Sequence, residues 1–194
     1  MKAPPRSRTN EDPVGPTVLV SERLFGVRSW QLAVDHDGVF RLRGFYESAR
    51  WKKDGKTTWA RCQLGVQKNR HKAPDGRCSC GLYALHPWNA DHCDYIRRPA
   101  SSGALTVVGL VEAWGQVQLH MEGFRAQYAR PKEIALIGVD ATSPYGRIVR
   151  ELASDHRAEL MIVADVAELK KACRQRGLGL TRATVASLLR AEGV

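Results

Sequence analysis

The chain has 194 residues, of which 43 % are hydrophobic and 26 % charged, and its formal net charge is +10. This composition is ordinary for a globular protein with one sizeable core. No apolar run is long enough to span a bilayer, and the N-terminus lacks the apolar stretch of a secretory signal. Five cysteines, an odd number, then favour a reducing compartment, and we expect a cytoplasmic protein whose thiols bind metal or are buried.

The excess positive charge falls in three segments, residues 1–60, 61–100 and 141–194, and not in 101–140. A basic surface of this size attracts polyanions, so nucleic acid is an expected partner; the alternative is a charged surface that only keeps the protein soluble. Residues 1–17 contain four prolines and both charge signs without apolar periodicity. We predict that they form a flexible basic arm.

Short alternating stretches from residue 18 to 67 predict β-structure. An Asp-Gly pair at 54–55 marks the tip of a hairpin, which also carries Trp51 and Trp59 nearby. The same tip holds three lysines, Lys52, Lys53 and Lys56. Interleaved cations and aromatic rings suit phosphate contact and base stacking. The alternative is a solvated turn whose tryptophans belong to the core.

Three thiols and one imidazole then follow within one short stretch: Cys62, His71, Cys78 and Cys80. This donor set suits a closed tetrahedral zinc site with a structural role. Gly81 directly after the last cysteine would relieve the backbone there. His86, His92 and Cys93 are spare donors, and the alternative is a set of reduced cysteines without metal. Acidic residues nearby lack the spacing of a catalytic zinc helix.

The stretch 104–137 alternates most regularly, and short strands at this density predict a small, strongly bent barrel. Residues 86–103, with two prolines and several small polar residues, are predicted to form a loop.

Two blocks of the chain, WARCQLGVQKNRHKAPDGRCSCGLYA and VVGLVEAWGQVQLHMEGFRAQYARP, resemble a family of small proteins from actinobacteria and their phages. The resemblance covers roughly residues 18–138. It implies that Cys62, His71, Cys78 and Cys80 belong together, and it implies no activity.

The remainder is predicted to be helical. Ser143 and Pro144 are typical of a helix start, and that helix runs to about His156. An apolar stretch at 159–163 is a strand or a connector. Helices at 166–176, opened by the capping pair Asp165 and Glu168, and at 182–191, capped by Thr181, complete the chain.

The last two helices resemble a helix-turn-helix, although the linker around Gly177 is about two residues too long for that motif. In the motif the second helix enters the major groove, so its first residues contact base edges. Those residues are Thr181, Arg182 and Thr184. Phosphate contacts are expected from Lys170, Lys171, Arg174 and Arg176. The alternative is a pair of amphipathic helices packed on the sheet.

The sequence therefore predicts an α+β protein: a flexible arm (1–17), a barrel-like antiparallel β domain with a zinc-stapled loop (18–138) and a helical segment (139–194). The expected function is nucleic-acid binding, most simply DNA binding, with zinc as a structural ion. Two alternatives remain: an interaction protein that binds a host protein through the β domain, and an enzyme acting on nucleic acid. The enzyme is disfavoured because the chain shows no paired carboxylates, nucleophile elbow or phosphate loop.

Overall fold

The computed structural model describes residues 17–45, 50–62, 71–76, 78–90, 105–176 and 180–191. The predicted arm, apart from its last residue, lies outside the described residues, as do most of the predicted loop at 86–103 and the linker 177–179.

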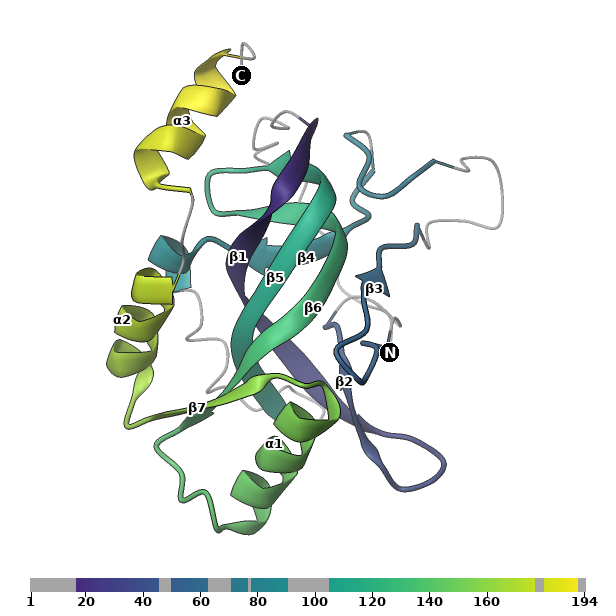
Figure 1. The fold of residues 1–194 in the computed structure, drawn as a ribbon, viewed down its shortest axis with the longest axis vertical. Coiled ribbons are helices and arrows are strands. Elements are labelled where there is room, and N and C mark those ends of the chain that lie inside the picture. The colour runs from purple at the N-terminus through teal and green to yellow at the C-terminus, as the bar shows by residue number, and fades with distance from the viewer. Residues whose placement is uncertain are drawn as a thin grey trace, which may run out of the picture.

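The described chain is a mixed α+β fold in which a bent sheet comes first and the helices follow (Figure 1). The strands are β1 (Thr17–Val34), β2 (Phe40–Arg43), β3 (Thr58–Trp59), β4 (Leu82–Leu85), β5 (Thr106–Leu119), β6 (Gly123–Ile137) and β7 (Glu159–Val163). The helices are α1 (Pro144–Asp155), α2 (Val166–Arg176) and α3 (Arg182–Ala191). The order of elements follows the sequence prediction closely, including the change from strands to helices after β6.

The centre of the sheet is the long antiparallel set β1-β5-β6. Strand β4 pairs along its length with β6 and meets β1 at a single residue pair, Val27 with Leu85, so the strand path returns to its start. The sheet is nevertheless not a regular barrel, and that prediction was too simple. The pairing of β1 with β4 that would close a barrel consists of one residue pair, and β2, β3 and β7 extend the sheet outside this path.

Three register shifts interrupt the pairing of the long strands. The pairing of β1 with β5 shifts between Val20 and Leu24, and the pairing of β5 with β6 shifts between Trp114 and Val117 and again between Leu110 and Val111. Gly115 lies inside the second shift with φ +82°, a left-handed conformation that glycine adopts without strain. Bulges of this kind increase local twist and bend the strand. They explain how strands of this length wrap around a core.

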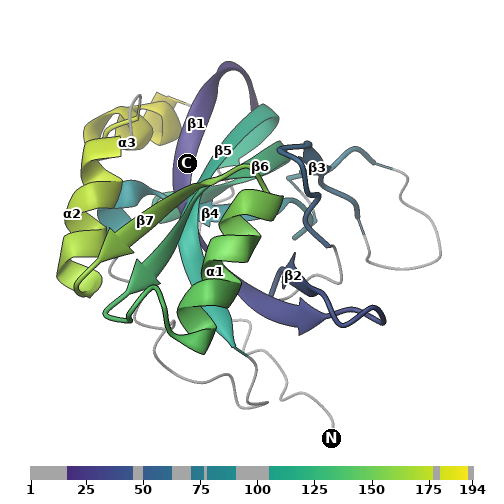
Figure 2. The same cartoon turned by 60° about the horizontal axis from the view of Figure 1, so that its bottom comes forward.

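The C-terminal segment begins as predicted. The Ser143 hydroxyl accepts a hydrogen bond from Gly146 N (3.0 Å), and Pro144 occupies the first turn of α1. The stretch 159–163 is a strand, β7, and it pairs in parallel with β6. Parallel pairing needs a crossover connection, and α1 provides it. The helical segment is thus joined to the sheet through its own strand (Figure 2).

The helices pack on two separate apolar clusters. The larger cluster joins the inner residues of the bent sheet to α1 and to Val185 and Leu189 of α3. The smaller cluster joins β1, β5, β6 and β7 to Leu169 and Cys173 of α2. Consequently α2 and α3 are each anchored to the sheet by their own buried residues.

Candidate metal centre and candidate nucleic-acid interface

The four predicted metal ligands lie together. Their donor atoms are all within 4.8 Å of one another: Cys62, His71, Cys78 and Cys80. The Sγ atoms of Cys62 and Cys78 are 3.6 Å apart, and Nε2 of His71 is 3.2 Å from Sγ of Cys80. Cys62 follows β3 and Cys80 precedes β4, so the four donors join two strands that both pair with β6.

These distances suit a tetrahedral shell. Zinc–sulfur bonds of about 2.3 Å place two sulfurs of a tetrahedral site about 3.8 Å apart, and zinc–nitrogen bonds are slightly shorter. The separations of 3.6 Å and 3.2 Å are close to those edges. The cluster is therefore compact enough to hold one metal ion, and its thiol and imidazole donors are compatible with zinc.

The thiols differ in acidity. Burial raises the pKa of Cys80 to about 12, and its contact with Cys78 adds to the effect. Burial also acts to raise the pKa of Cys78, but hydrogen bonds from the Cys80 backbone N–H and from Cys62 outweigh it and leave that pKa below the ordinary value. Adjacent thiolates repel, so one ionises at the expense of its neighbour. A bound cation removes this conflict and allows all three thiols to ionise.

A tight backbone turn presents the last two cysteines. Cys78 N donates to Asp75 O (3.0 Å), and Gly81 has φ +132°. A Cβ atom at Gly81 would lie 2.9 Å from Cβ of Arg125 and 3.3 Å from Cβ of Pro74, so a larger residue would push the turn away from the sheet. The predicted relief of the backbone by Gly81 is confirmed, and its reason is this close approach to β6.

Arg125 of β6 binds the backbone of this turn. Its side chain is buried, and Nη1 donates to the carbonyl oxygens of Cys78 and of Cys80 (3.2 Å for the latter), while Nη2 donates to Oε1 of Gln118. Within the described residues, the acceptors of this guanidinium are all neutral, and it forms no ion pair with a carboxylate. Burying a charge without an opposite charge is costly.

A metal ion at the cluster would resolve that cost. One divalent zinc with three thiolates and a neutral imidazole carries a net charge of about −1, next to the Arg125 guanidinium. Sequence reasoning missed this residue, because an arginine within the alternating stretch after Gly123 resembles a solvent-facing position. The alternation of Phe124, Arg125 and Ala126 is typical of a strand with one solvent face, so the sequence carries no local signal that Arg125 is buried.

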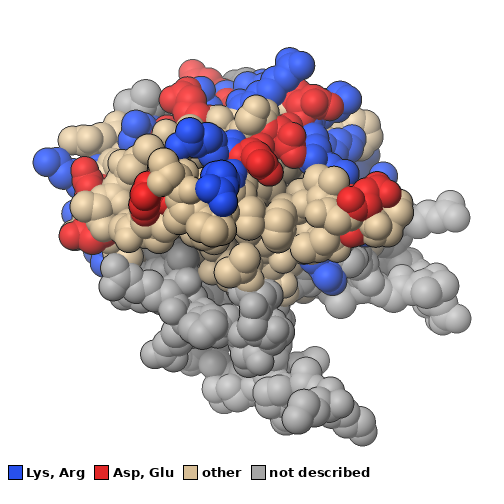
Figure 3. Space-filling view, turned by 90° about the horizontal axis from the view of Figure 1, so that it is seen from below, with Lys and Arg blue, Asp and Glu red and all other residues tan. Residues whose placement is uncertain are grey.

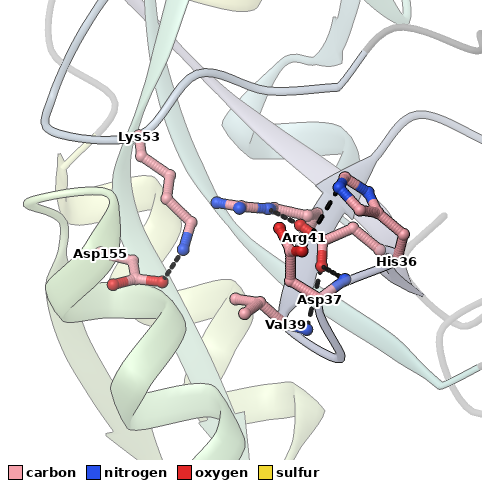
Figure 4. A network of polar contacts seen from close by, with 7 residues as sticks. His36, Asp37, Val39, Arg41, Lys53 and Asp155 are labelled. Carbon is pink, nitrogen blue, oxygen red and sulfur yellow. Dashed lines mark hydrogen bonds and ion pairs between the residues drawn. The ribbon is translucent and has the colours of Figure 1, made fainter.

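The lysine-bearing segment that the sequence predicts as a hairpin is a turn docked on α1. Its one flanking strand, β3, pairs with β6 and not with the residues before the turn. Asp54 and Gly55 both have positive φ, as expected for the tip of the turn. Asp54 N donates to Asp155 O (2.7 Å) at the end of α1, and Lys53 forms an ion pair with the Asp155 carboxylate (Figure 4). Lys56 pairs with Asp54 at 3.2 Å. Of the three lysines, Lys52 alone has no carboxylate partner within the described residues.

The two hairpin tryptophans have different environments. Trp51 is buried and packs edge-on against Trp30, as the core alternative expected. Trp59 is 56 % exposed, and Nζ of Lys52 lies 5.0 Å from its ring centre. The predicted neighbouring of a cation and an accessible aromatic ring is therefore found at Trp59 and not at Trp51.

The C-terminal candidates remain on the surface. Thr181, Arg182 and Thr184 are exposed, and Thr181 caps α3 by accepting from Thr184 N (3.1 Å). The hydroxyl groups of Thr181 and Thr184 also form a hydrogen bond with each other at 2.8 Å. Lys171 and Arg174 are exposed and Lys170 is half-buried.

Arg176 is engaged by the sheet. Its Nε lies 2.9 Å from Oε1 of the buried Glu133 on β6, and burial raises the pKa of that carboxyl. The pair ties the end of α2 to the sheet, so this cation of the predicted phosphate-binding set already has an anionic partner.

Positive and negative side chains are mixed on one face of the molecule. On the face at the bottom of Figure 1, blue and red side chains are interspersed and no single continuous basic patch is seen (Figure 3). Charge alone therefore does not mark one contact surface on that face.

Comparison of the chain with protein-family models, with curated proteins and with solved structures finds no match. Among the described residues no helix is long and apolar enough to cross a membrane.

Proposed function

We propose that this protein binds nucleic acid and that a structural zinc ion holds its Cys/His loop to the sheet. The observation that carries the metal part is the convergence of Cys62, His71, Cys78 and Cys80 within 4.8 Å. The buried Arg125 beside the cluster supports it, because the guanidinium supplies a positive charge where a zinc–thiolate group supplies a negative one.

The structural role of the ion follows from the number of donors. Four protein ligands close the tetrahedral shell and leave no position for a water or substrate, which a catalytic zinc requires. Within the described residues no carboxylate belongs to the cluster.

The nucleic-acid part is supported by the net charge of +10 and by exposed cations without carboxylate partners among the described residues, such as Lys52 and Lys171. In the same proposal α3 is the element for sequence preference in duplex DNA, since Arg182 and Thr184 are exposed in its first turn. A protein partner bound through the β domain is the competing outcome.

The test is a binding titration with the metal content known. Protein purified without chelator should contain about one zinc per chain by elemental analysis. Its affinity for labelled DNA or RNA should fall linearly with salt on logarithmic axes, because phosphate contacts release counterions. Absence of binding to both polymers at low salt would overturn the nucleic-acid proposal and favour the protein partner.

A further inference from the structure

A continuous row of aromatic rings crosses the sheet next to the Cys/His loop. Trp59 of β3 pairs directly with Tyr128 of β6, which pairs directly with Trp114 of β5. Directly paired residues of antiparallel strands project on the same face, so the three rings are neighbours. Their ring centres are 6.1 Å apart from Trp59 to Tyr128 and 6.1 Å from Tyr128 to Trp114.

The bulge in β5 makes room for this row. A Cβ atom at Gly115 would lie 2.6 Å from Cδ2 of Tyr128, so the ring lies directly over the glycine. The positive φ of Gly115 and the missing side chain thus serve the same purpose, which is to let Tyr128 lie close against β5.

A cation stands at each end of the row. Arg23, in the bulged part of β1, places Cζ 3.6 Å from the ring centre of Trp114, and Lys52 lies over Trp59. Arg23 and Lys52 are both exposed and form no ion pair within the described residues. Arg61, two residues after Trp59, is exposed as well. Glu112, beside the row, forms an ion pair with Arg130.

This arrangement differs from a hydrophobic core that happens to reach the surface. Trp59 is 56 % exposed, whereas Trp30 and Trp51 are almost fully buried. Proteins bind single-stranded nucleic acid through successive aromatic rings flanked by cations, since bases stack on the rings while phosphates contact the cations. A duplex keeps its bases stacked inside and offers only phosphates to such a surface.

From this geometry we infer that the row Trp59–Tyr128–Trp114, with Lys52 and Arg23 at its ends, is a binding surface for single-stranded nucleic acid. The inference rests on the proposed function and adds a single-strand site on the sheet to the duplex contact proposed for α3. The ring contacts are the same for DNA and RNA, and separate probes distinguish the two.

The experiment is fluorescence anisotropy with labelled oligothymidine, oligouridine and a duplex, each about twelve nucleotides long, at several salt concentrations. We expect both single strands, or one of them, to bind more tightly than the duplex. Trp59→Ala should lower single-strand affinity by roughly tenfold without changing the slope against salt, because stacking involves no counterion. Lys52→Gln should reduce that slope by about one.

Two controls accompany these variants. Ile162→Ala removes a side chain of similar exposure on β7, away from the row, and should leave all affinities unchanged. Trp59→Phe retains a ring and should lose less affinity than Trp59→Ala, which excludes a simple loss of folding. Wild-type protein that binds no nucleic acid would overturn the proposed function. Tight binding that prefers the duplex or is unaffected by Trp59→Ala would overturn this inference alone.

Discussion

The Cys/His loop and the C-terminal segment are both attached to the same sheet, but by different forces. The C-terminal segment contributes buried apolar residues to two clusters, with Leu152 and Val185 in one and Leu169 in the other. Among the described residues from His71 to Gly81, Ala73, Pro74 and Cys80 are buried, and Arg125 of the sheet binds this loop through carbonyl oxygens of its backbone. Burial of apolar area stabilises the first directly, whereas the second depends on its ligands and on Arg125.

The largest expected effect concerns the ion. Cys80→Ser, or removal of metal by a chelator, should lower the free energy of unfolding by several kcal/mol, because a structural ion binds only the folded state. Thermal melts of loaded and stripped protein measure this. Stripped protein that melts at the same temperature as loaded protein would contradict the structural role of zinc.

Leu169→Ala is the matched control on the other region. Leu169 is fully buried against β7 and its neighbours, so its truncation should cost about 2–5 kcal/mol. Unlike Cys80→Ser, it should cost the same in loaded and stripped protein, since it leaves the Cys/His cluster unchanged.

A smaller effect is expected from the interaction between the Arg125 guanidinium and the metal ion. Arg125→Gln removes the buried positive charge, and we expect it to destabilise the loaded protein by about 1–3 kcal/mol more than the stripped one. Denaturant melts of the four species form a double-mutant cycle for the charge and the ion. If Arg125→Gln destabilises the stripped protein more, the guanidinium acts through its hydrogen bonds and not as a counterion.

The effect that is smallest near neutral pH is a pH dependence in the sheet itself. His86 is buried, and burial lowers its pKa from 6.5 to about 4. Since the unfolded chain then binds the proton more readily, stability should fall as pH drops below 6.5 and continue to fall until about pH 4, by at most about 1.4 kcal/mol per pH unit. Melts of His86→Phe should show a flatter pH profile than wild type over this range.

The exposed His36 provides the comparison for that experiment. Its side chain is 82 % accessible, so His36→Gln should leave the melting temperature near neutral pH unchanged. A profile that is identical in wild type and His86→Phe would mean that another group, such as the metal thiolates, governs acid stability.

The sequence predicted local features better than global ones. Caps, such as Ser143 and Thr181, and the Asp54-Gly55 turn are encoded by adjacent residues, and each was confirmed. The metal cluster was predicted because ligand chemistry is visible in residue types and spacing. The docking of the hairpin on α1 was not, because Lys53 and Asp155 are far apart in the sequence.

The aromatic row shows the same limit. The row is made by residues of three different strands, Trp59, Trp114 and Tyr128. The sequence of one strand does not determine the register in which it pairs with the others. A glycine inside a strand indicates a bend or a close approach without saying to what, and the structure identifies the group that approaches Gly115 as the Tyr128 ring. Predicting the row would require the strand pairing first.

The pairing of β1 has a consequence for synthesis of the protein. Gln31 of this first strand pairs with Thr106, and Thr17 pairs with Gln118, so the partner strand is made long after β1. At about 5–20 residues per second, the part of β1 before Gln31, which β2 does not pair, waits for several seconds on the ribosome with its apolar residues and backbone edge unpaired. Long-range pairing of this kind is slow to form and prone to aggregation until it does. Chaperone binding to the nascent chain is therefore expected to begin at β1 and to end when β5 emerges.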